Sequence, residues 1–557
     1  MSRTRERTLS AKRWSPWWSR VWIVLCAITW VGTVSYRYSV GSLFICVGLF
    51  LALWGLALAF SHRPYFALTL STTVLLFFTV LSKAKEFFWN EKLFFADFEL
   101  FLDPSNTETV LHYPWALVAF LGITLILVTV TVLGWRASRT WMRSSLVGVL
   151  AGILGVGLMA WSQTQYQNTW LRTLPKGQNV PTNVVMSTKI AYQDPGQTVT
   201  GDPTVFEAAQ KTLAPSEVYQ AAQSQPLPDI VLLLQESTFN PALYSDITSG
   251  LPTLGMFAPN GRQAEGLLRV HTYGGGTWRS EFAALSGLSS DDFGAAAGAV
   301  FYSAVFHVKT GLFHELRRYG YDTYVLTPFN PSSYNAQSAY EALGVENIRQ
   351  PQNYGYPAPF NKNLWHISTE DMLKYAKELL ETEPGDKPKV VYVLTMAEHG
   401  PYRDRVDDVT LSVTDGVNAV PYENYVSRLK ASDKAVVDFE NWVKTGDKRR
   451  LFVRFGDHQG HLGFNASYRM ALSQPQYVTQ FELVDSGVNV ANDPAPLTDI
   501  VYLPGLIVER LQGTPSAFYQ ANINARRLLE GAYSDKQADP LLDGYRAYLF
   551  KTLKVAP

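Results

Sequence analysis

The stretch Ile230–Ser237, which reads IVLLLQES, is an apolar run that ends in a polar, acidic sequence. An uncharged run of Ile, Val and Leu is typical of a strand that is buried on both faces of a parallel sheet. Glu236 follows this run directly, at a point where a buried carboxylate needs a partner. The stretch therefore predicts a buried strand with a functional residue at its carboxyl end.

The same pattern recurs along the second half of the chain. Further strand-like runs lie at Thr323–Leu326, Val390–Leu394 and Leu451–Phe455. Helical patterns alternate with them at Leu312–Tyr319, Ala336–Leu343, Glu370–Glu381 and Glu423–Lys444. This alternation predicts an α/β domain with a parallel-rich sheet between helices, which binds its ligand beyond the carboxyl ends of the strands.

The first part of the chain has a different composition. Of the 557 residues, 47% are hydrophobic and only 17% are charged, and uncharged apolar segments concentrate before residue 162. These segments are Val21–Tyr36, Val40–Ser61, Tyr65–Ser82, Trp115–Trp135 and Ser144–Trp161. The last four are long enough to cross a hydrocarbon layer of about 30 Å, and tryptophans flank the shorter first one. We expect an all-α domain of five transmembrane helices over residues 1–161; a signal peptide followed by buried core helices is the alternative.

The basic residues of the loops predict the orientation. One side of the predicted membrane domain would carry Arg3, Arg5, Arg7, Lys12, Arg13, Arg20, Arg63, Arg136, Arg139 and Arg143. The other side would carry only Arg37, Lys83, Lys85 and Lys92. Because basic loops stay inside, the N-terminus is expected in the cytoplasm and everything after Trp161 outside, as in a protein of the bacterial inner membrane with a periplasmic or extracellular domain.

Three further regions complete the organisation. Residues 83–113 mix aromatic and acidic residues, which suits an amphipathic segment in the outer interface. Residues 162–227 are polar and read as a linker with a helix at Val205–Ala222. Residues 228–557 form the predicted sheet domain. This domain contains no cysteine, because Cys26 and Cys46 both lie in apolar segments, and a net charge of zero gives no argument for a nucleic-acid partner.

Two more motifs offer groups that suit phosphate and metal chemistry. Thr277 follows three glycines and precedes the helical pattern Arg279–Leu285, so that its hydroxyl would lie at a helix N-terminus that favours anions. Asp457-His458 follows the strand Leu451–Phe455. With Glu236, these residues supply oxygen ligands and one nitrogen, which suits a divalent Zn²⁺ or Mn²⁺ ion. A threonine hydroxyl bound to such an ion can become a nucleophile.

Other residues are candidates with simpler alternatives. Arg279 could bind a phosphate oxygen or form an ordinary salt bridge. His399, in a loop after Val390–Leu394, could protonate a leaving group or serve the loop structure. Thr277 could be a plain helix cap and Glu236 a helix-dipole contact. The weaker histidine candidates are His461, expected beside the ligands or in solvent, His271 and His366.

These motifs together resemble those of a known family, over nearly the whole chain. Helices that cross the membrane, followed by Glu236, by Thr277 before Ser280-Glu281-Phe282, and by Gly456-Asp457-His458, are similar to the lipoteichoic acid synthases and periplasmic glucan phosphoglycerol transferases of the alkaline phosphatase/sulfatase superfamily. The resemblance implies that Glu236, Thr277, Asp457 and His458 bind one metal ion. It also implies that Thr277 is the nucleophile and that His399, before Pro401-Tyr402, contacts the substrate.

The chain also departs from the family pattern. Where members that handle glycerol phosphate often have Trp-Asn-Arg, this chain has Tyr334-Asn335-Ala336, so that Asn335 remains as a substrate-binding candidate but the arginine is missing. Glu398 stands where lipoteichoic acid synthases have asparagine. These changes leave the transferred group open between phosphoglycerol and phosphoethanolamine, although the cysteines of phosphoethanolamine transferases are absent.

The resemblance implies a membrane transferase with a phospholipid donor and an extracytoplasmic glycan acceptor. Two alternatives remain open from the sequence: a sulfatase-like phosphodiesterase that uses water, and an inactive scaffold for polysaccharide assembly. The sequence does not indicate an oligomeric state.

Overall fold

The computed structural model describes residues 16–35, 40–141, 144–173, 178–190, 199–462, 466–534 and 539–556. The chain divides into two units, which we call the helical unit (Met1–Phe98 and Thr107–Tyr192) and the sheet unit (Glu99–Asn106 and Gln193–Pro557). The chain therefore enters the sheet unit briefly at Glu99, returns to the helical unit at Thr107, and leaves it again after Tyr192.

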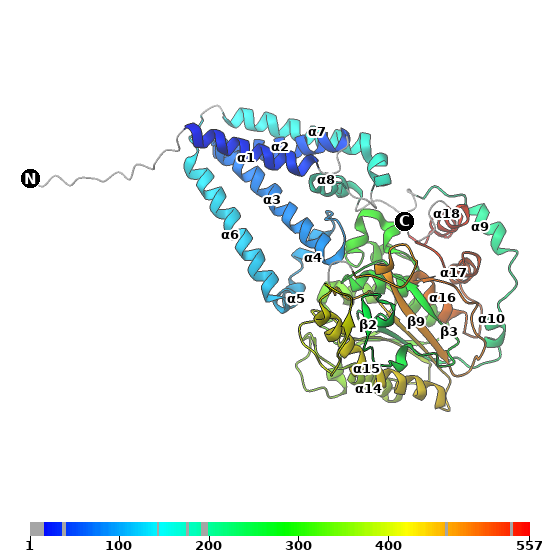
Figure 1. Cartoon of the computed structure of the whole chain (residues 1–557). Helices are drawn as coiled ribbons and strands as arrows, with labels where there is room; N and C mark the ends of the chain where they lie inside the picture. The colour runs from blue at the N-terminus through cyan, green and yellow to red at the C-terminus, as the bar shows by residue number, and fades with distance from the viewer. Residues whose placement is uncertain are drawn as a thin grey trace, which may run out of the picture. The chain divides into compact units, whose positions relative to one another are not determined.

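The helical unit consists of long apolar helices and a few short ones (Figure 1). They are α1 (Pro16–Ser35), α2 (Val40–Ser61), α3 (Pro64–Trp89), α5 (Thr107–His112), α6 (Pro114–Ala137), α7 (Ser144–Thr173) and α8 (Val180–Ile190), with α4 (Asp97–Leu102) at the boundary between the units. Four spans are long and apolar enough to cross a membrane, namely Gly41–Ser61, Pro64–Trp89, Leu117–Ala137 and Ser144–Gln167. The apolar part of α1, Ser19–Thr33, is shorter. This is the arrangement of a membrane protein, with the first predicted segment the shortest as expected.

The prediction of orientation depends partly on residues outside the described ranges. Arg3, Arg5, Arg7, Lys12, Arg13, Arg37 and Arg143 fall there. Arg63, one of the described basic residues, donates hydrogen bonds to the carbonyl oxygens of Trp135 and Ser138, at the end of α6.

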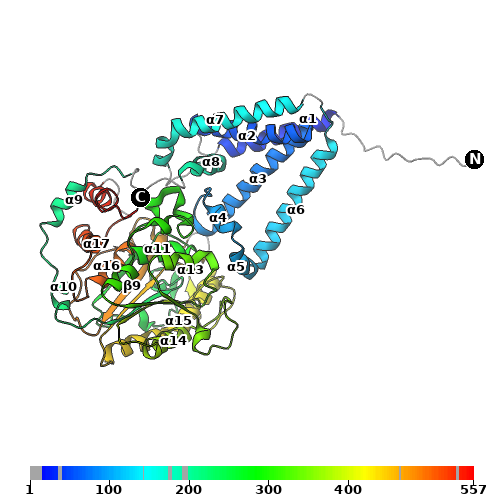
Figure 2. The ribbon, with the colours of Figure 1, turned by 180° about the vertical axis from the view of Figure 1, so that it is seen from behind.

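Glycines hold α2 and α7 in close contact, and both figures show these two helices side by side (Figures 1 and 2). A Cβ atom on Gly148 would meet the backbone nitrogen of Ala59 and the carbonyl oxygen of Gly55, each at 2.5 Å. Small residues at such positions let two apolar helices approach backbone to backbone. The polar stretch after Trp161 continues α7 to Thr173, where Gln163 donates to the carbonyl oxygen of Val185 in α8 at 2.6 Å.

A buried ion pair orders the part of residues 83–113 that belongs to the helical unit. Lys85 Nζ lies 2.8 Å from Asp97 Oδ1 and also donates to the carbonyl oxygen of Lys92 at 3.1 Å. Asp97 Oδ2 in turn accepts from the backbone nitrogen of Phe94 at 2.7 Å. The segment is therefore a folded hook between α3 and α4.

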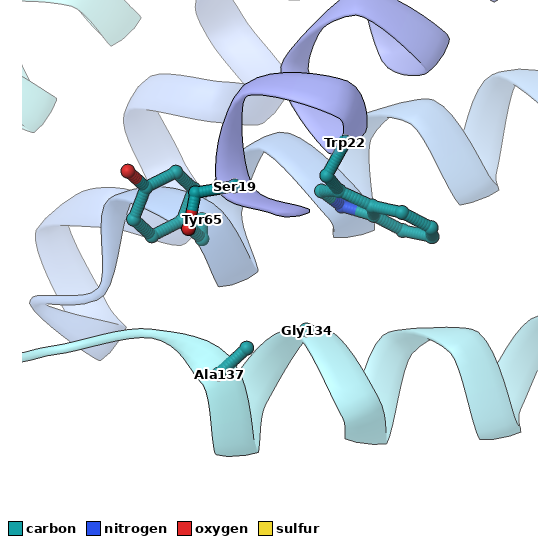
Figure 3. A pocket seen from close by; sticks show the side chains of 5 residues that line it. All are labelled: Ser19, Trp22, Tyr65, Gly134 and Ala137. Atoms are coloured by element: carbon teal, nitrogen blue, oxygen red, sulfur yellow. The ribbon is translucent and has the colours of Figure 1, made fainter. Parts of the chain in front are cut away.

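A small pocket lies among the apolar helices of the helical unit (Figure 3). Its lining residues are Ser19, Trp22, Tyr65, Gly134 and Ala137. None of these is a candidate site residue, because all the candidates belong to the sheet unit.

The sheet unit is built on an eight-stranded sheet of order β10-β3-β9-β8-β1-β6-β4-β5. Its strands are β1 (Asp229–Gln235), β3 (Ala264–Arg269), β4 (Asp322–Leu326), β5 (Asn347–Arg349), β6 (Lys389–Leu394), β8 (Arg450–Gly456), β9 (Val478–Asp485) and β10 (Thr498–Asp499). The neighbours from β8 to β5 pair in parallel, whereas β9 runs antiparallel to both β8 and β3. β2 (Ile247–Ser249) and β7 (Ser412–Val413) form a separate antiparallel pair.

Helices cover both faces of the sheet. Alternate residues of the central strands point to opposite sides, and because these residues are apolar, each side needs a covering layer. Ile230, Leu232 and Leu234 of β1 pack in one core with α11 (Thr277–Ser286), α12 (Leu312–Arg318), α13 (Ala336–Ala342), α16 (Leu503–Val508), α17 (Ala517–Leu528) and α18 (Pro540–Ala547). Val231 and Leu233 pack in a second core with α14 (Thr369–Thr382) and α15 (Ala419–Thr445), which lie together on the other face (Figures 1 and 2). The predicted fold class is confirmed.

The region predicted as a linker helix at Val205–Ala222 contains two short helices instead of one. These are α9 (Pro203–Gln210) and α10 (Glu217–Ala222). Asp202 caps α9 by accepting from the backbone nitrogen of Thr204, and Ser216 caps α10 by accepting from that of Tyr219. Pro215 lies between the two helices, before the second cap.

Candidate active site

The register of two neighbouring strands brings Glu236 beside Asp457. In the parallel pair of β1 and β8, Gln235 lies opposite Gly456. The residues that follow this pair, Glu236 and Asp457, therefore leave the sheet at the same edge and at the same level, about 4.8 Å apart. His458 follows at once, and all three side chains are fully buried.

Thr277 reaches the same place from a different element. It is the first residue of α11, after Gly276, which has a φ of 82° in the left-handed region that favours glycine. A Cβ atom on Gly276 would also lie 2.8 Å from Thr272 Oγ1. The Thr277 hydroxyl donates to Glu236 Oε2 at 3.2 Å.

The three buried side chains present their ligand atoms to one another. One atom each of Glu236, Asp457 and His458 lies within 4.8 Å of the others. His458 Nε2 is 3.3 Å from Glu236 Oε1 and 3.2 Å from Asp457 Oδ2. His458 Nδ1 lies 3.0 Å from the carbonyl oxygen of Gln459. A proton on Nδ1 that is donated to this oxygen leaves the lone pair on Nε2, the nitrogen that would bind a metal ion.

Two orphaned atoms indicate that this group fits a cation. Asp457 Oδ2 and His458 Nε2 are buried and make no hydrogen bond with any described residue. Burial raises the pKa of Glu236 well above its usual value, and the charge of Asp457 raises it further. A divalent ion between these atoms would compensate both carboxylates, and the oxygen and imidazole donors suit Zn²⁺ or Mn²⁺.

Two serines that sequence reasoning did not single out hold Glu236 and Asp457 in place, Ser237 through their carboxylates and Ser280 through the backbone of Asp457. Ser237 donates its backbone N–H to Asp457 Oδ1 at 2.8 Å and its hydroxyl to Glu236 Oε1 at 2.9 Å. It does so from a φ of 50°, which is uncommon for a residue other than glycine. Ser280 Oγ donates to the carbonyl oxygen of Asp457 at 2.5 Å. Both serines stand inside the quoted motifs, so their position beside the ligands was the available signal.

Glu281 adds a further buried carboxylate, one turn after Thr277 in α11. Its Oε1 accepts from Tyr340 at 2.5 Å and from Tyr392 at 2.9 Å. Burial raises the pKa of Glu281 to about 7, although the hydroxyls of Tyr340, Tyr392 and Tyr334 act in the opposite direction. The tyrosines come from distant parts of the chain, so no local signal predicted this cluster.

His399 lies in the loop that follows β6, the strand beside β1. Its ring stands edge-on to Trp365, with centroids 5.5 Å apart, and its Nδ1 is 2.5 Å from the carbonyl oxygen of Gly400. The neighbouring Glu398 is buried and accepts from Gln235 at 2.9 Å and from Thr369 at 2.8 Å. Glu398 thus ties the His399 loop to the end of β1.

The remaining candidates make other contacts. Arg279 donates to Ser290 Oγ at 3.0 Å and pairs with Asp291 Oδ1 at 2.6 Å. Asn335 Nδ2 donates to the carbonyl oxygen of Phe301 at 2.7 Å.

Two of the weaker histidine candidates, His461 and His271, contact other side chains. The ring of His461 lies 5.8 Å from that of Tyr273. His271 forms a buried pair with Asp499 at 2.9 Å and is not one of the three clustered ligands.

Comparison with known proteins gives related sequences and related structures. The sulfatase family matches residues 228–500. An uncharacterized protein of Haemophilus influenzae is 33% identical over 551 residues, which cover 96% of this chain and 98% of that protein. The capsular polysaccharide biosynthesis protein RkpI of Rhizobium meliloti is 26% identical over 417 residues, 72% of this chain and 74% of that protein.

Among solved structures, the Streptococcus pyogenes phosphoglycerol transferase GacH in complex with sn-glycerol-1-phosphate has the same fold. The TM-score is 0.51 at 16% identity, over 64% of this chain and 94% of that one. With a relative that is 33% identical over 96% of this chain and a sulfatase match over most of the sheet unit, this chain belongs to the sulfatase family.

Proposed function

We propose that this protein is a membrane-bound, metal-dependent phosphotransferase that moves a phospholipid head group, phosphoglycerol or phosphoethanolamine, to an extracytoplasmic glycan. The observation that carries the proposal is the hydrogen bond of 3.2 Å from Thr277 Oγ1 to Glu236 Oε2, beside the orphaned ligand atoms of Asp457 and His458. A nucleophilic hydroxyl, two carboxylates and an imidazole are the parts that metal-assisted phosphoryl transfer needs.

The residues have distinct proposed roles. Glu236, Asp457, His458 and the Thr277 hydroxyl would hold one divalent ion, which when bound would lower the pKa of that hydroxyl and offset negative charge on the phosphate. Glu236 Oε2 already accepts the hydrogen bond from Thr277, so it is placed to receive the hydroxyl proton. The positive end of the α11 dipole, at Thr277, would favour the incoming phosphate.

The transfer runs in two steps. Thr277 Oγ forms a bond to the head-group phosphorus while the bond from phosphorus to the diacylglycerol oxygen breaks, and His399 gives the leaving oxygen a proton. A glycan hydroxyl then gives its proton to His399 and forms the new bond to phosphorus, while the bond from phosphorus to Thr277 Oγ breaks and Thr277 recovers its proton from Glu236. Arg279 and Asn335 remain proposed substrate contacts, and each would have to exchange its present partner for a phosphate oxygen.

The apolar helices fit this reaction because the donor is a lipid. Helices long enough to span a bilayer would keep the enzyme at the surface where the phospholipid lies, and its diacylglycerol product stays there. We propose that the N-terminus is cytoplasmic and that the sheet unit lies outside the inner membrane of a bacterium, in line with the distribution of Lys and Arg. The similarity to a capsular polysaccharide biosynthesis protein is consistent with a glycan acceptor.

A Thr277→Ala variant tests the proposal. The full-length, metal-loaded protein is incubated with phosphatidylglycerol that carries a fluorescent acyl chain, and the released diacylglycerol is measured. Loss of release in Thr277→Ala, with normal release in the control Thr382→Ala on the exposed side of α14, supports the proposal. Undiminished release by Thr277→Ala rules out the proposed nucleophile.

A phosphodiesterase that uses water is the second candidate, and the sulfatase match favours it because sulfatases are hydrolases. It has the same site and the same first step. Addition of a glycan acceptor separates the two: a transferase increases its turnover and labels the glycan, whereas a hydrolase releases the free head-group phosphate at an unchanged rate.

A further inference from the structure

One short segment of the chain belongs to the sheet unit although its neighbours on both sides belong to the helical unit. This segment is Glu99–Asn106, which we call the strap. It lies on the connection between α3 and α6, two of the helices that are long and apolar enough to cross a membrane. The connection between two apolar helices is thus folded as a part of the unit that contains the candidate active site.

Polar side chains fix the strap to the sheet unit. Asn106 Oδ1 accepts from the backbone nitrogen of Tyr334 at 2.8 Å. Asn106 Nδ2 donates to the carbonyl oxygen of Leu100 at 2.9 Å and to the Tyr302 hydroxyl at 3.1 Å. The Tyr302 hydroxyl in turn donates to Asp103 Oδ2 at 2.6 Å. The amide of Asn106 is therefore the centre of a clamp that joins the strap to Tyr302 and Tyr334.

The clamp acts on a turn that needs support. Tyr334 has a φ of 43° and Asn335 has a φ of 59°, so that two successive residues other than glycine adopt the left-handed conformation. Each such residue costs about 1 kcal/mol and persists only when its surroundings hold it. Asn106 holds the backbone of Tyr334, and the carbonyl oxygen of Phe301 holds the side chain of Asn335.

The ring of Tyr334 packs near the start of α11, and we call this ring the Tyr334 wall of the candidate site. It lies 6.0 Å from the ring of Trp278, the residue next to Thr277. Burial raises the pKa of the Tyr334 hydroxyl, as do the nearby charges of Glu281 and Glu236. A displacement of Tyr334 would therefore be felt at Trp278, at Glu281 and at the start of α11.

We propose that the strap Glu99–Asn106 is a positioning element, which uses the Asn106 clamp to set the Tyr334 wall and so couples the connection between two membrane helices to the chemistry at Thr277. This inference rests on the proposed function and adds a regulatory link to it. Asn106, Asp103 and Tyr302 are positioning residues, since each acts on the site through Tyr334.

The test uses the full-length, metal-loaded protein and the variant Asn106→Ala. Two substrates are followed: a fluorescent phosphatidylglycerol and the soluble diester bis(p-nitrophenyl) phosphate. Asn106→Ala is expected to lower kcat for both substrates by about ten- to a hundredfold, because a small misplacement of a site wall is enough to slow phosphoryl transfer. KM and the Mn²⁺ affinity are expected to stay within about twofold of wild type, which separates a positioning role from a collapse of the site.

The controls give each result one meaning. Leu111→Ala, on the exposed surface of α5 just after the strap, is expected to keep wild-type turnover. Wild-type kcat in Asn106→Ala overturns the inference, as does a parallel loss of Mn²⁺ binding or an equal loss in Leu111→Ala. Thr277→Ala is run beside them: if it stays active the proposed function fails, whereas an inactive Thr277→Ala with a fully active Asn106→Ala refutes the strap alone.

Discussion

Glu236 and Asp457 are neighbours because Gln235 and Gly456 lie opposite each other in the parallel pair of β1 and β8. Two buried carboxylates in this position repel each other unless a cation lies between them. Their arrangement, with His458 Nε2 within 3.3 Å of both, is the structural basis for the proposed metal site.

We predict that metal binding releases a proton. Burial and the charge of Asp457 raise the pKa of Glu236, so that in the metal-free protein Glu236 holds a proton up to a higher pH than usual. A divalent ion must displace it, and the apparent affinity for Zn²⁺ or Mn²⁺ should therefore increase with pH. Calorimetric titration in two buffers of different ionisation enthalpy measures the release, which is expected to be about one proton per ion. An affinity that is flat between pH 5 and pH 8 would contradict the assignment.

The ligand variants Asp457→Asn and His458→Gln should lose both metal and activity. Each removes one donor from a site of few ligands, and we expect the metal affinity to fall by at least about a hundredfold. Metal content by mass spectrometry measures the loss directly. Asp438→Asn is the control, since this carboxylate is exposed on α15, where it pairs with Lys434.

The buried pair of His271 and Asp499 should make the free energy of unfolding of the sheet unit fall as the pH becomes alkaline. Burial by itself would lower the pKa of His271, but the Asp499 carboxylate 2.9 Å away raises it from 6.5 to about 9. The folded state therefore keeps a proton that the unfolded chain loses. Its contribution is complete below pH 6.5 and is lost as the pH rises through 9, by roughly 3 kcal/mol in total.

A His271→Gln variant checks this prediction. The difference in thermal unfolding temperature between wild type and variant should be largest near pH 6 and should shrink towards pH 9.5. A difference that grows with pH would show that the imidazole is neutral in the folded protein.

The helical unit depends on the close contact of α2 and α7. Gly148→Leu places side-chain atoms where the backbone of Gly55 and Ala59 now lies, so that the two helices must separate. We expect a loss of about 2 kcal/mol or more, measured as a lower unfolding temperature in detergent. Gly157→Leu on the same helix is the control, because a Cβ atom there meets nothing within 4 Å.

The hook between α3 and α4 depends on Lys85. Lys85→Met leaves the buried carboxylate of Asp97 without its cation, which costs about 3–5 kcal/mol locally. Limited proteolysis should then cleave within residues 90–98 at a lower protease concentration than in wild type. The exposed neighbour Lys83 pairs with Glu86 at the surface, so Lys83→Met should change the cleavage by little, in line with about 0–1 kcal/mol for such pairs.

Much of the sheet unit was predictable because its central strands carry a local signal. Ile230–Leu234, Thr323–Leu326, Val390–Leu394 and Leu451–Phe455 all fall within observed strands, namely β1, β4, β6 and β8. The strands that were missed lie towards the edges of the sheet. β9 pairs antiparallel and alternates with polar residues such as Gln480 and Glu482, and β10 has only two residues. Short or partly polar strands give no uncharged run to recognise.

The sequence predicted the candidate site only where a residue of a suitable type directly follows a strand. Glu236, Asp457 and His458 stand directly after strands, and the fold brings them together with Thr277. The cluster of Tyr334, Tyr340 and Tyr392 around Glu281 depends on side chains that approach from separate elements. The strap was not predictable either, because its role depends on the non-local hydrogen bonds of Asn106.

The most direct test of the account is the mass of the peptide that contains Thr277, after the full-length metal-loaded protein has been incubated with phospholipid and quenched in acid. This peptide is expected to gain the mass of glycerol phosphate or ethanolamine phosphate. Fragmentation should place the group on Thr277, and metal removal should abolish the modification. An unmodified Thr277 in protein that releases diacylglycerol, or the same group on another residue, would contradict the account.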